Sequence, residues 1–170
     1  AKLGAASKPV VAEGPKDPRW IIVGEGPGMN EQRDGRPFVG ASGRMVDKVL
    51  QMIRVARDTL WITNATLCLP PPNASEGVKK KAQQCCAPRL QAELAQFPPE
   101  IPILALGAVA SQGFLGDKFS ITQMAGSLWT VDTDGTGQVR HIIPTVHPAA
   151  ILRGGAGGGL TLAPGATPAE

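Results

Sequence analysis

The chain has 170 residues, enough for one hydrophobic core and too few for two ordinary domains. Its 17 basic and 14 acidic residues give a net charge of +3, which is compatible with a polyanionic partner but does not require one. No apolar run approaches the roughly 18 residues that cross a bilayer, and the N-terminus lacks a signal-peptide core. We therefore expect a soluble, intracellular protein with no membrane partner.

Cysteine content and terminal composition bear on the compartment and on the domain limits. Three cysteines leave at least one thiol unpaired, so a reducing compartment fits better than a disulfide framework. Residues 1–18 and the Gly/Ala/Pro-rich residues 154–170 are predicted to be tails of one folded domain over 19–153. Because the chain begins with Ala1, we expect a processed product or a part of a longer protein.

The first half of this domain predicts two strands separated by a helix. Arg19–Val23 is a short β-branched run that ends at glycine, as buried strands do. A loop of about fifteen residues follows, which is long for a compact αβ connection and therefore suggests function. Helical spacing of apolar residues predicts a helix from Ser42, its expected N-cap, to about Arg57, and Leu60–Thr63 predicts the second strand.

The second half continues the alternation of helices and strands. A long helix is predicted over 76–97, which Pro88 is expected to kink or divide. A strand, a short helix and two strands joined by a Gly/Asp turn follow, over 101–106, 108–115, 128–131 and 139–143. Strands alternating with helices predict an α/β fold, a three-layer α/β/α sandwich with a mostly parallel central sheet.

In such sheets ligands bind beyond the carboxyl ends of the strands. Gly24, Asn64, Gly107 and His147 all fall at these ends, so residues far apart in sequence are expected at one rim. The glycine loop at 24–28 alone suggests a phosphate cradle or a plain tight turn. A dinucleotide-type cradle needs a helix directly after the glycines, which the proline and the long polar loop oppose, so a nucleotide-binding protein is the weakest alternative.

The ordered set of motifs resembles the uracil-DNA glycosylase superfamily, most closely its family-four, thermophile-type branch. The segments that carry this resemblance are Gly24–Gly28 with Glu31, Gly35–Gly40, Thr63-Asn64 with Cys68 and Pro70–Asn73, Leu106-Gly107, and His147–Ala149 with Leu152-Arg153. The resemblance implies a monomeric DNA repair enzyme that acts on single- or double-stranded uracil-containing DNA. Such an enzyme excises uracil by hydrolysing the N-glycosidic bond of a flipped-out deoxyuridine and leaves an abasic site.

Three residues are expected to recognise and release the base. Phe38 lies in a polar Gly/Pro-rich loop and is expected to stack on the flipped uracil rather than to serve as ordinary core. The Asn64 amide offers the donor and the acceptor that complement O4 and N3–H of uracil, whereas cytosine presents the opposite pair. His147 is expected to donate a hydrogen bond to O2 as negative charge builds on the departing base, for which a neutral imidazole suffices.

The first motif supplies two carboxylates and lacks a third. The resemblance places Glu25 and Gly26 in the uracil pocket, and Glu31 is expected to position water or to stabilise the cationic sugar. Either carboxylate has the plain alternative of a solvated loop charge. The best-known branch of the superfamily has a water-aligning Asp where this chain has Gly26, and Gly28 replaces a bulky residue that blocks the thymine methyl. We therefore expect catalysis by stabilising the leaving group and the cation.

Leu152 and Arg153 are expected to contact DNA, as a wedge in the duplex and a phosphate ligand. The alternative is a short amphipathic helix that packs on the sheet. The basic run 79–81 suggests a phosphate patch, although such a run is usually the solvated face of a helix.

The cysteines depart from the family pattern. The thermophile-type enzymes carry an iron–sulfur cluster on four cysteines, of which Cys68 and Cys86 match the later two, while residues 1–19 contain none. We expect no cofactor or metal unless ligands come from outside this chain or from residues other than cysteine. These departures leave a second hypothesis, a non-catalytic DNA- or uracil-binding module of a larger replication or repair protein.

Overall fold

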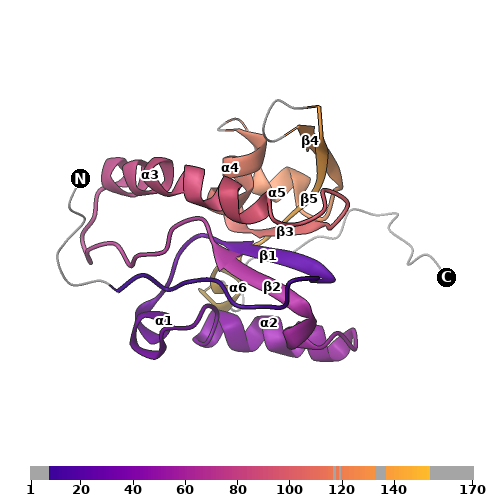
Figure 1. Ribbon diagram of the computed structural model, residues 1–170. Helices are drawn as coiled ribbons and strands as arrows, with labels where there is room; N and C mark the ends of the chain where they lie inside the picture. The colour runs from indigo at the N-terminus through magenta and orange to yellow at the C-terminus, as the bar shows by residue number, and fades with distance from the viewer. Residues whose placement is uncertain (1–7, 117, 119, 133–136, 154–170) are drawn as a thin grey trace.

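A computed structural model describes residues 8–116, 118, 120–132 and 137–153 (Figure 1). In chain order these residues form β1 (Trp20–Gly24), α1 (Met29–Asp34), α2 (Ala41–Met52), the short 3-10 helix η1 (Arg57–Thr59), β2 (Leu60–Asn64), α3 (Glu76–Leu94), β3 (Ile103–Leu106), α4 (Gly107–Leu115), α5 (Ile121–Met124), β4 (Trp129–Asp132), β5 (Val139–Thr145) and α6 (Pro148–Arg153). None of the helices described is long and apolar enough to span a bilayer.

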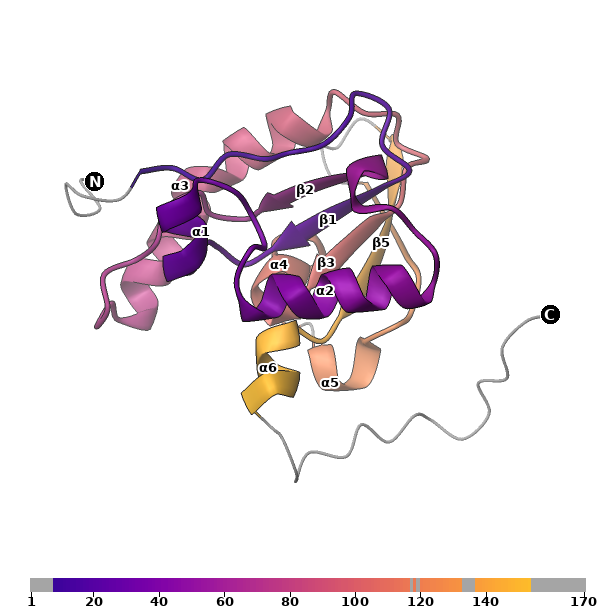
Figure 2. The same cartoon turned by 90° about the horizontal axis from the view of Figure 1, so that it is seen from below.

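The strands form one five-stranded sheet in the order β2-β1-β3-β5-β4. β2, β1, β3 and β5 are parallel, and only β4 runs antiparallel, at the edge beside β5. Helices α3 and α4 cover one face of this sheet, and α2 covers the other (Figures 1 and 2). The predicted three-layer α/β/α fold with a mostly parallel sheet is therefore confirmed.

Each face of the sheet has its own apolar core, because successive strand side chains point to opposite faces. Ile21 and Val23 of β1 pack toward α3 with Leu90 and Leu94, whereas Ile22 packs toward α2. All three β1 residues are at most 1% exposed. Burying such a side chain contributes about 1.5–3 kcal/mol, which explains why this strand reads as a continuous β-branched run.

The limits of α2 differ from the prediction at both ends. α2 begins at Ala41 with Gly40 as its N-cap, so the prediction that Ser42 caps the helix is wrong. It ends at Met52 instead of reaching 57, because Arg54 takes a left-handed backbone with φ of 55°. Pro88 does not divide α3, which runs unbroken through it. Pro88 lies on the exposed face of that helix, where water can bind the carbonyl that loses its N–H partner.

The loop after β1 contains α1, which the sequence did not predict. Gly35 ends this six-residue helix in a left-handed conformation with φ of 69°. Residues 8–18, which composition assigned to a tail, lie along β2: Val10 is 2% exposed and Glu13 pairs with Ile62. The folded part thus begins before residue 19. The C-terminal tail over 154–170 and most of the predicted turn before β5 lie outside the described residues.

Candidate active site

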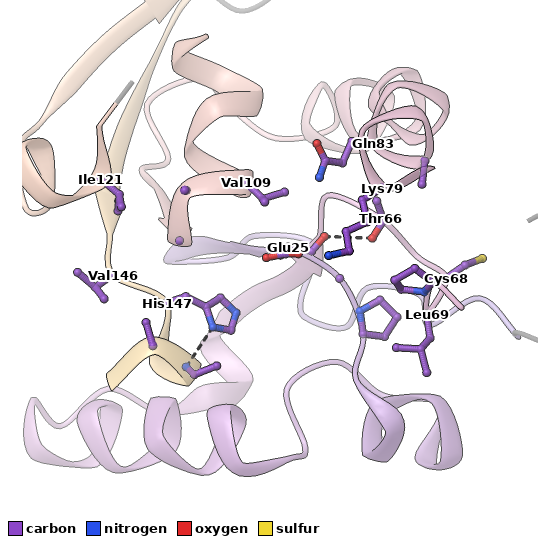
Figure 3. A pocket seen from close by; sticks show the side chains of 18 of the residues that line it. Glu25, Thr66, Cys68, Leu69, Lys79, Gln83, Val109, Ile121, Val146 and His147 are labelled. Atoms are coloured by element: carbon purple, nitrogen blue, oxygen red, sulfur yellow. Dashed lines mark hydrogen bonds between the residues drawn. The ribbon is translucent and has the colours of Figure 1, made fainter. Parts of the chain in front are cut away.

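Two adjoining hollows lie at the carboxyl ends of the parallel strands. The smaller, of about 280 Å³, is lined by Phe38, Asn64, Glu31 and the loop at 26–30, and we call it the small hollow. The larger, of about 480 Å³, is lined by residues of α3, α4 and α6 and by the start of the loop after β2, and we call it the large hollow (Figure 3). Gly26, Pro27, His147 and Ala149 line both hollows, so they form the boundary between them. The rim predicted from the strand ends is therefore a real concave site.

Phe38 forms one wall of the small hollow and also packs in the core beneath α2. Its ring centroid is 6.4 Å from that of His147, with the ring planes tilted by 31°. Phe38 is therefore a core residue whose ring also forms a flat pocket surface. These two roles were alternatives in the prediction from sequence. The backbone of Phe38 is left-handed, with φ of 52°, which a residue other than glycine adopts only when its surroundings enforce it.

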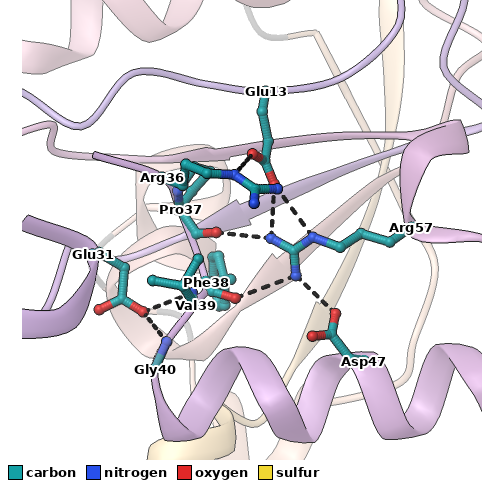
Figure 4. Close-up of polar contacts among 9 residues, drawn as sticks. All are labelled: Glu13, Glu31, Arg36, Pro37, Phe38, Val39, Gly40, Asp47 and Arg57. Atoms are coloured by element: carbon teal, nitrogen blue, oxygen red, sulfur yellow. Dashed lines mark hydrogen bonds and ion pairs between the residues drawn. The ribbon is translucent and has the colours of Figure 1, made fainter. Parts of the chain in front are cut away.

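Arg57 holds this loop from one side (Figure 4). Its guanidinium donates to the carbonyl oxygens of Pro37 at 2.7 Å and Phe38 at 3.2 Å. The guanidinium is fixed in turn by the carboxylates of Glu13 at 2.9 Å and Asp47 at 2.8 Å. Burial raises the pKa of Glu13, and the hydrogen bonds from Arg36 and Arg57 lower it, with a net lowering. The N-terminal segment thus supports the pocket wall through Arg57.

Glu31 holds the same loop from the other side. Its carboxylate is buried and accepts hydrogen bonds from the backbone N–H groups of Gly28 at 3.1 Å, Val39 at 2.9 Å and Gly40 at 2.6 Å. Both oxygens therefore bind backbone, and the bond to Gly40 fixes the start of α2. This geometry gives Glu31 a role in placing Phe38, whereas the catalytic role expected from the sequence remains a proposal.

Asn64 ends β2 and lines the small hollow with only 2% of its surface exposed. Its backbone carbonyl accepts a 2.6 Å hydrogen bond from Arg89 of α3, which also binds the carbonyl of Ala65 at 3.2 Å. Glu93 orients Arg89 through a 2.6 Å ion pair and also accepts from the indole N–H of Trp61 at 2.7 Å. The strand end that carries the amide is thereby held at a fixed position.

His147 lies in the turn before α6 and faces both hollows. The backbone N–H of Ala149 donates to its Nδ1 at 3.1 Å, so Nδ1 is the unprotonated nitrogen and the hydrogen-bond network assigns the proton to Nε2. Burial, with the nearby Arg153 as a second cause, lowers the pKa of the imidazole. Gly107, with φ of 90°, lets the ring approach, since a Cβ there would lie 2.8 Å from the Cβ of His147. His147 is thus a neutral N–H donor at the boundary.

The remaining predicted residues lie around the large hollow. Glu25 is exposed and lines it, beside Gly26 at the boundary. Arg153 also lines it from α6, while Leu152 is 47% exposed on the same helix. A short helix does form here, but the packing observed is against α2 (Figure 2), whereas the alternative placed it on the sheet; its apolar tip at Ile151 and Leu152 is about half exposed. Lys79 lines the hollow and is paired with Glu76 at 2.6 Å.

The cysteines do not form a complete cluster site in the described part of the chain. Cys68 and Cys86 are half-buried, Cys85 is exposed, and all three are free. No group of three or more His, Cys, Asp or Glu residues converges there as metal ligands. A four-thiolate cluster needs one more cysteine than the three in this sequence.

Comparison with known proteins settles the family. The model of the uracil DNA glycosylase superfamily matches residues 11–161. The chain belongs to the uracil-DNA glycosylase superfamily. It is similar to the type-4 uracil-DNA glycosylase of Thermotoga maritima, at 38% identity over 85% of this chain and 71% of the relative. The type-4 uracil-DNA glycosylases of Sulfurisphaera tokodaii and Pyrobaculum aerophilum are each 32% identical, over 84% and 78% of this chain and 65% and 67% of their own lengths.

Within this superfamily fold, sequence motifs located Phe38, Asn64 and His147, which the structure brings to one hollow. Motif analysis missed Arg57 and Arg89, which hold the backbone on either side of that hollow. The only sequence signal for Arg89 was the spacing of four residues to Glu93 on one helix, a common surface pattern. Arg57 had no such signal, because its partners lie ten or more residues away.

Proposed function

We propose that this chain is a uracil-DNA glycosylase that hydrolyses the N-glycosidic bond of a flipped-out deoxyuridine and leaves an abasic site. The observation that carries the proposal is the meeting of the Asn64 amide, the Phe38 ring and the His147 boundary in the small hollow. Its volume of about 280 Å³ lies just below the range of about 300–1,000 Å³ for small-molecule pockets, as a site for one base should. The names of the type-4 relatives support the same activity.

Base recognition follows from the side chain of Asn64. Its amide N–H donates to O4 of uracil, and its carbonyl oxygen accepts from N3–H. Cytosine reverses both groups, so its entry leaves buried polar atoms unpaired at a cost of about 1–3 kcal/mol each. Arg89 binds the backbone carbonyl of Asn64 at 2.6 Å and so keeps the strand end that carries the amide at the pocket wall.

Bond cleavage is assisted by stabilising the departing base. As the bond from C1′ to N1 lengthens, negative charge spreads to O2 of uracil, where the Nε2–H of His147 donates. The hydrogen bond that Nδ1 accepts from the backbone N–H of Ala149 fixes the tautomer with the proton on Nε2. The lowered pKa keeps the ring neutral near pH 7. Phe38 stacks on the base and holds it in line with these groups.

The DNA strand is proposed to run along the large hollow. Arg153 on its wall is suited to a backbone phosphate, and the exposed apolar tip at Leu152 is suited to the gap left by the flipped nucleotide. Glu25 and Gly26 are proposed to contact the uracil nucleotide at the boundary of the hollows. No step is assigned to an iron–sulfur cluster, since the described cysteines do not complete a site.

The test is release of uracil from oligonucleotides that contain one deoxyuridine, single-stranded or in a duplex, with thymine- and cytosine-containing controls. We expect release by the wild type and a loss of at least about 100-fold in His147→Ala, the effect of removing one oxyanion donor. The rate of uracil release should fall by a similar factor in Asn64→Ala. A wild type that binds this DNA but releases no uracil would instead support a non-catalytic binding module. The absorbance spectrum of anaerobically purified protein is the separate test for a cluster.

A further inference from the structure

Thr66 carries a buried hydroxyl on the wall of the large hollow, next to Gly26 at the boundary, and it belongs to none of the sequence motifs. It follows Asn64 by two residues, is 8% exposed and lines the large hollow together with Gly26 and His147 (Figure 3). Its Oγ1 donates to the backbone carbonyl of Glu25 at 3.1 Å. The hydroxyl proton is therefore committed to protein, and within the described residues no group donates to this oxygen, so its lone pairs can accept.

The oxygen of Thr66 occupies the space beside Gly26 that a side chain at that position would fill. A Cβ built on Gly26 collides with Thr66 Oγ1, whereas the Cβ of Thr66 is 3.8 Å away. It is thus the hydroxyl, rather than the carbon skeleton, that faces the Gly26 backbone. Gly26 lines both hollows, so this polar atom lies beside the boundary that the sugar of a nucleotide with its base in the small hollow would face.

Hydrolysis needs a water molecule held at C1′ of this sugar, and the carboxylates near the site are poorly placed to hold it. Both oxygens of Glu31 are bound by backbone N–H groups. Glu25 is exposed, and an exposed glutamate side chain samples many rotamers. A single torsion, χ1, sets the position of the Thr66 hydroxyl oxygen, and the hydrogen bond to the carbonyl of Glu25 fixes that torsion. The accepting oxygen therefore has a defined position.

We propose that the hydroxyl of Thr66 accepts a hydrogen bond from the attacking water and orients it toward C1′, which makes Thr66 a catalytic residue. The water oxygen forms the new bond to C1′ while the bond from C1′ to N1 breaks. The electron pair of that bond leaves with uracil, and His147 stabilises the charge at O2. One water proton passes to bulk solvent, and solvent protonates the uracil anion. The inference rests on the proposed glycosylase activity.

The test compares Thr66→Val, which keeps the shape and removes the hydroxyl, with Thr66→Ser, which keeps the hydroxyl. Single-turnover uracil release is measured together with the Kd for an oligonucleotide that carries an uncleavable 2′-fluoro-deoxyuridine. For Thr66→Val we expect the rate to fall on the order of 10- to 100-fold. A general base typically contributes about 10²–10⁴-fold, and the effect of Thr66 should be no larger than the low end of that range, because its hydroxyl orients the water without taking its proton. Thr66→Ser should stay within about threefold of wild type, and Kd should not change in either variant.

Three results would overturn the inference: a Thr66→Val rate within about twofold of wild type, an equal loss in Thr66→Ser, or a loss confined to Kd. Urea denaturation of both variants shows whether they are folded. If Thr66→Val is not folded, Thr66→Ala with the same readouts replaces it. Wild-type protein that releases no uracil would refute the glycosylase proposal itself, so the two failures are distinguishable.

Discussion

Replacing Arg57 by methionine tests how the ring of Phe38 is held in the pocket. The change keeps a long side chain and removes the guanidinium that binds the carbonyl oxygens of Pro37 and Phe38. The left-handed backbone at Phe38 costs about 1–2 kcal/mol relative to ordinary backbone. Without the guanidinium this cost favours a relaxed loop, and a difference of about 1–2 kcal/mol reduces the fraction of correctly placed rings by about 5- to 30-fold.

The kinetic loss should lie toward the lower end of that range, because Glu31 still binds the backbone of Val39 and Gly40. We therefore expect kcat/KM for uracil release to fall by about 5- to 10-fold. Stability should fall as well. Arg57 is 24% exposed and makes charge-assisted bonds to two carbonyls and two carboxylates, so we expect the free energy of unfolding to fall by about 2–4 kcal/mol.

The assay is steady-state uracil release with urea denaturation, and the matched control is Arg54→Met at an exposed position three residues away. A double-mutant cycle with Phe38→Leu separates the two roles of Arg57. If Arg57 acts through the ring, the double variant should release uracil no more slowly than Phe38→Leu alone. Fully additive kinetic losses, or an Arg57→Met rate within twofold of wild type at reduced stability, would refute the reasoning.

Three further predictions concern stability and are checked by urea denaturation. Burial lowers the pKa of His147 below its ordinary 6.5, so the unfolded chain binds more protons than the folded chain in this pH range. The contribution of the neutral imidazole to stability is therefore present above pH 6.5 and is lost as the pH falls through the lowered pKa. This loss of stability should be smaller in His147→Gln. Glu31→Gln replaces one acceptor oxygen by a donor facing backbone N–H groups, and should lower the free energy of unfolding by about 2–4 kcal/mol; unchanged stability would contradict the role of Glu31 in the loop. In Gly43→Ala the new Cβ collides with the carbonyl of Phe38 and should cost about 1–3 kcal/mol, whereas Gly113→Ala, with nothing within 4 Å, should be neutral or stabilising.

The two N-terminal strands, β1 and β2, were predictable because they are buried on both faces. Both appear in the sequence as short apolar, β-branched runs; β1 lies one residue later than predicted, and β2 extends one residue further. α1 was not predictable, because its six residues are too few for a periodic pattern and its start is capped by Glu31, whose carboxylate also binds the chain eight and nine residues later. Ser42 failed as a cap for the same reason, since Gly40 is fixed by Glu31 and the helix begins directly after it.

The candidate site was predictable only where side chains face the substrate. Asn64 ends β2 and His147 lies two residues beyond β5, so topology alone brings them to the rim. Arg57, Arg89 and Thr66 bind backbone carbonyls of distant segments. Every residue has such a carbonyl, so these partners leave no residue-specific pattern in the sequence.

The most direct test of the account is uracil release by Asn64→Asp, a change of almost identical shape. The carboxylate has no donor for O4 of uracil and repels it, while the Arg89 bond to the backbone carbonyl of residue 64 should persist. We predict a loss of kcat/KM for single-stranded deoxyuridine on the order of 1,000-fold with the free energy of unfolding nearly unchanged. A rate within about tenfold of wild type would contradict the claim that this amide recognises the base.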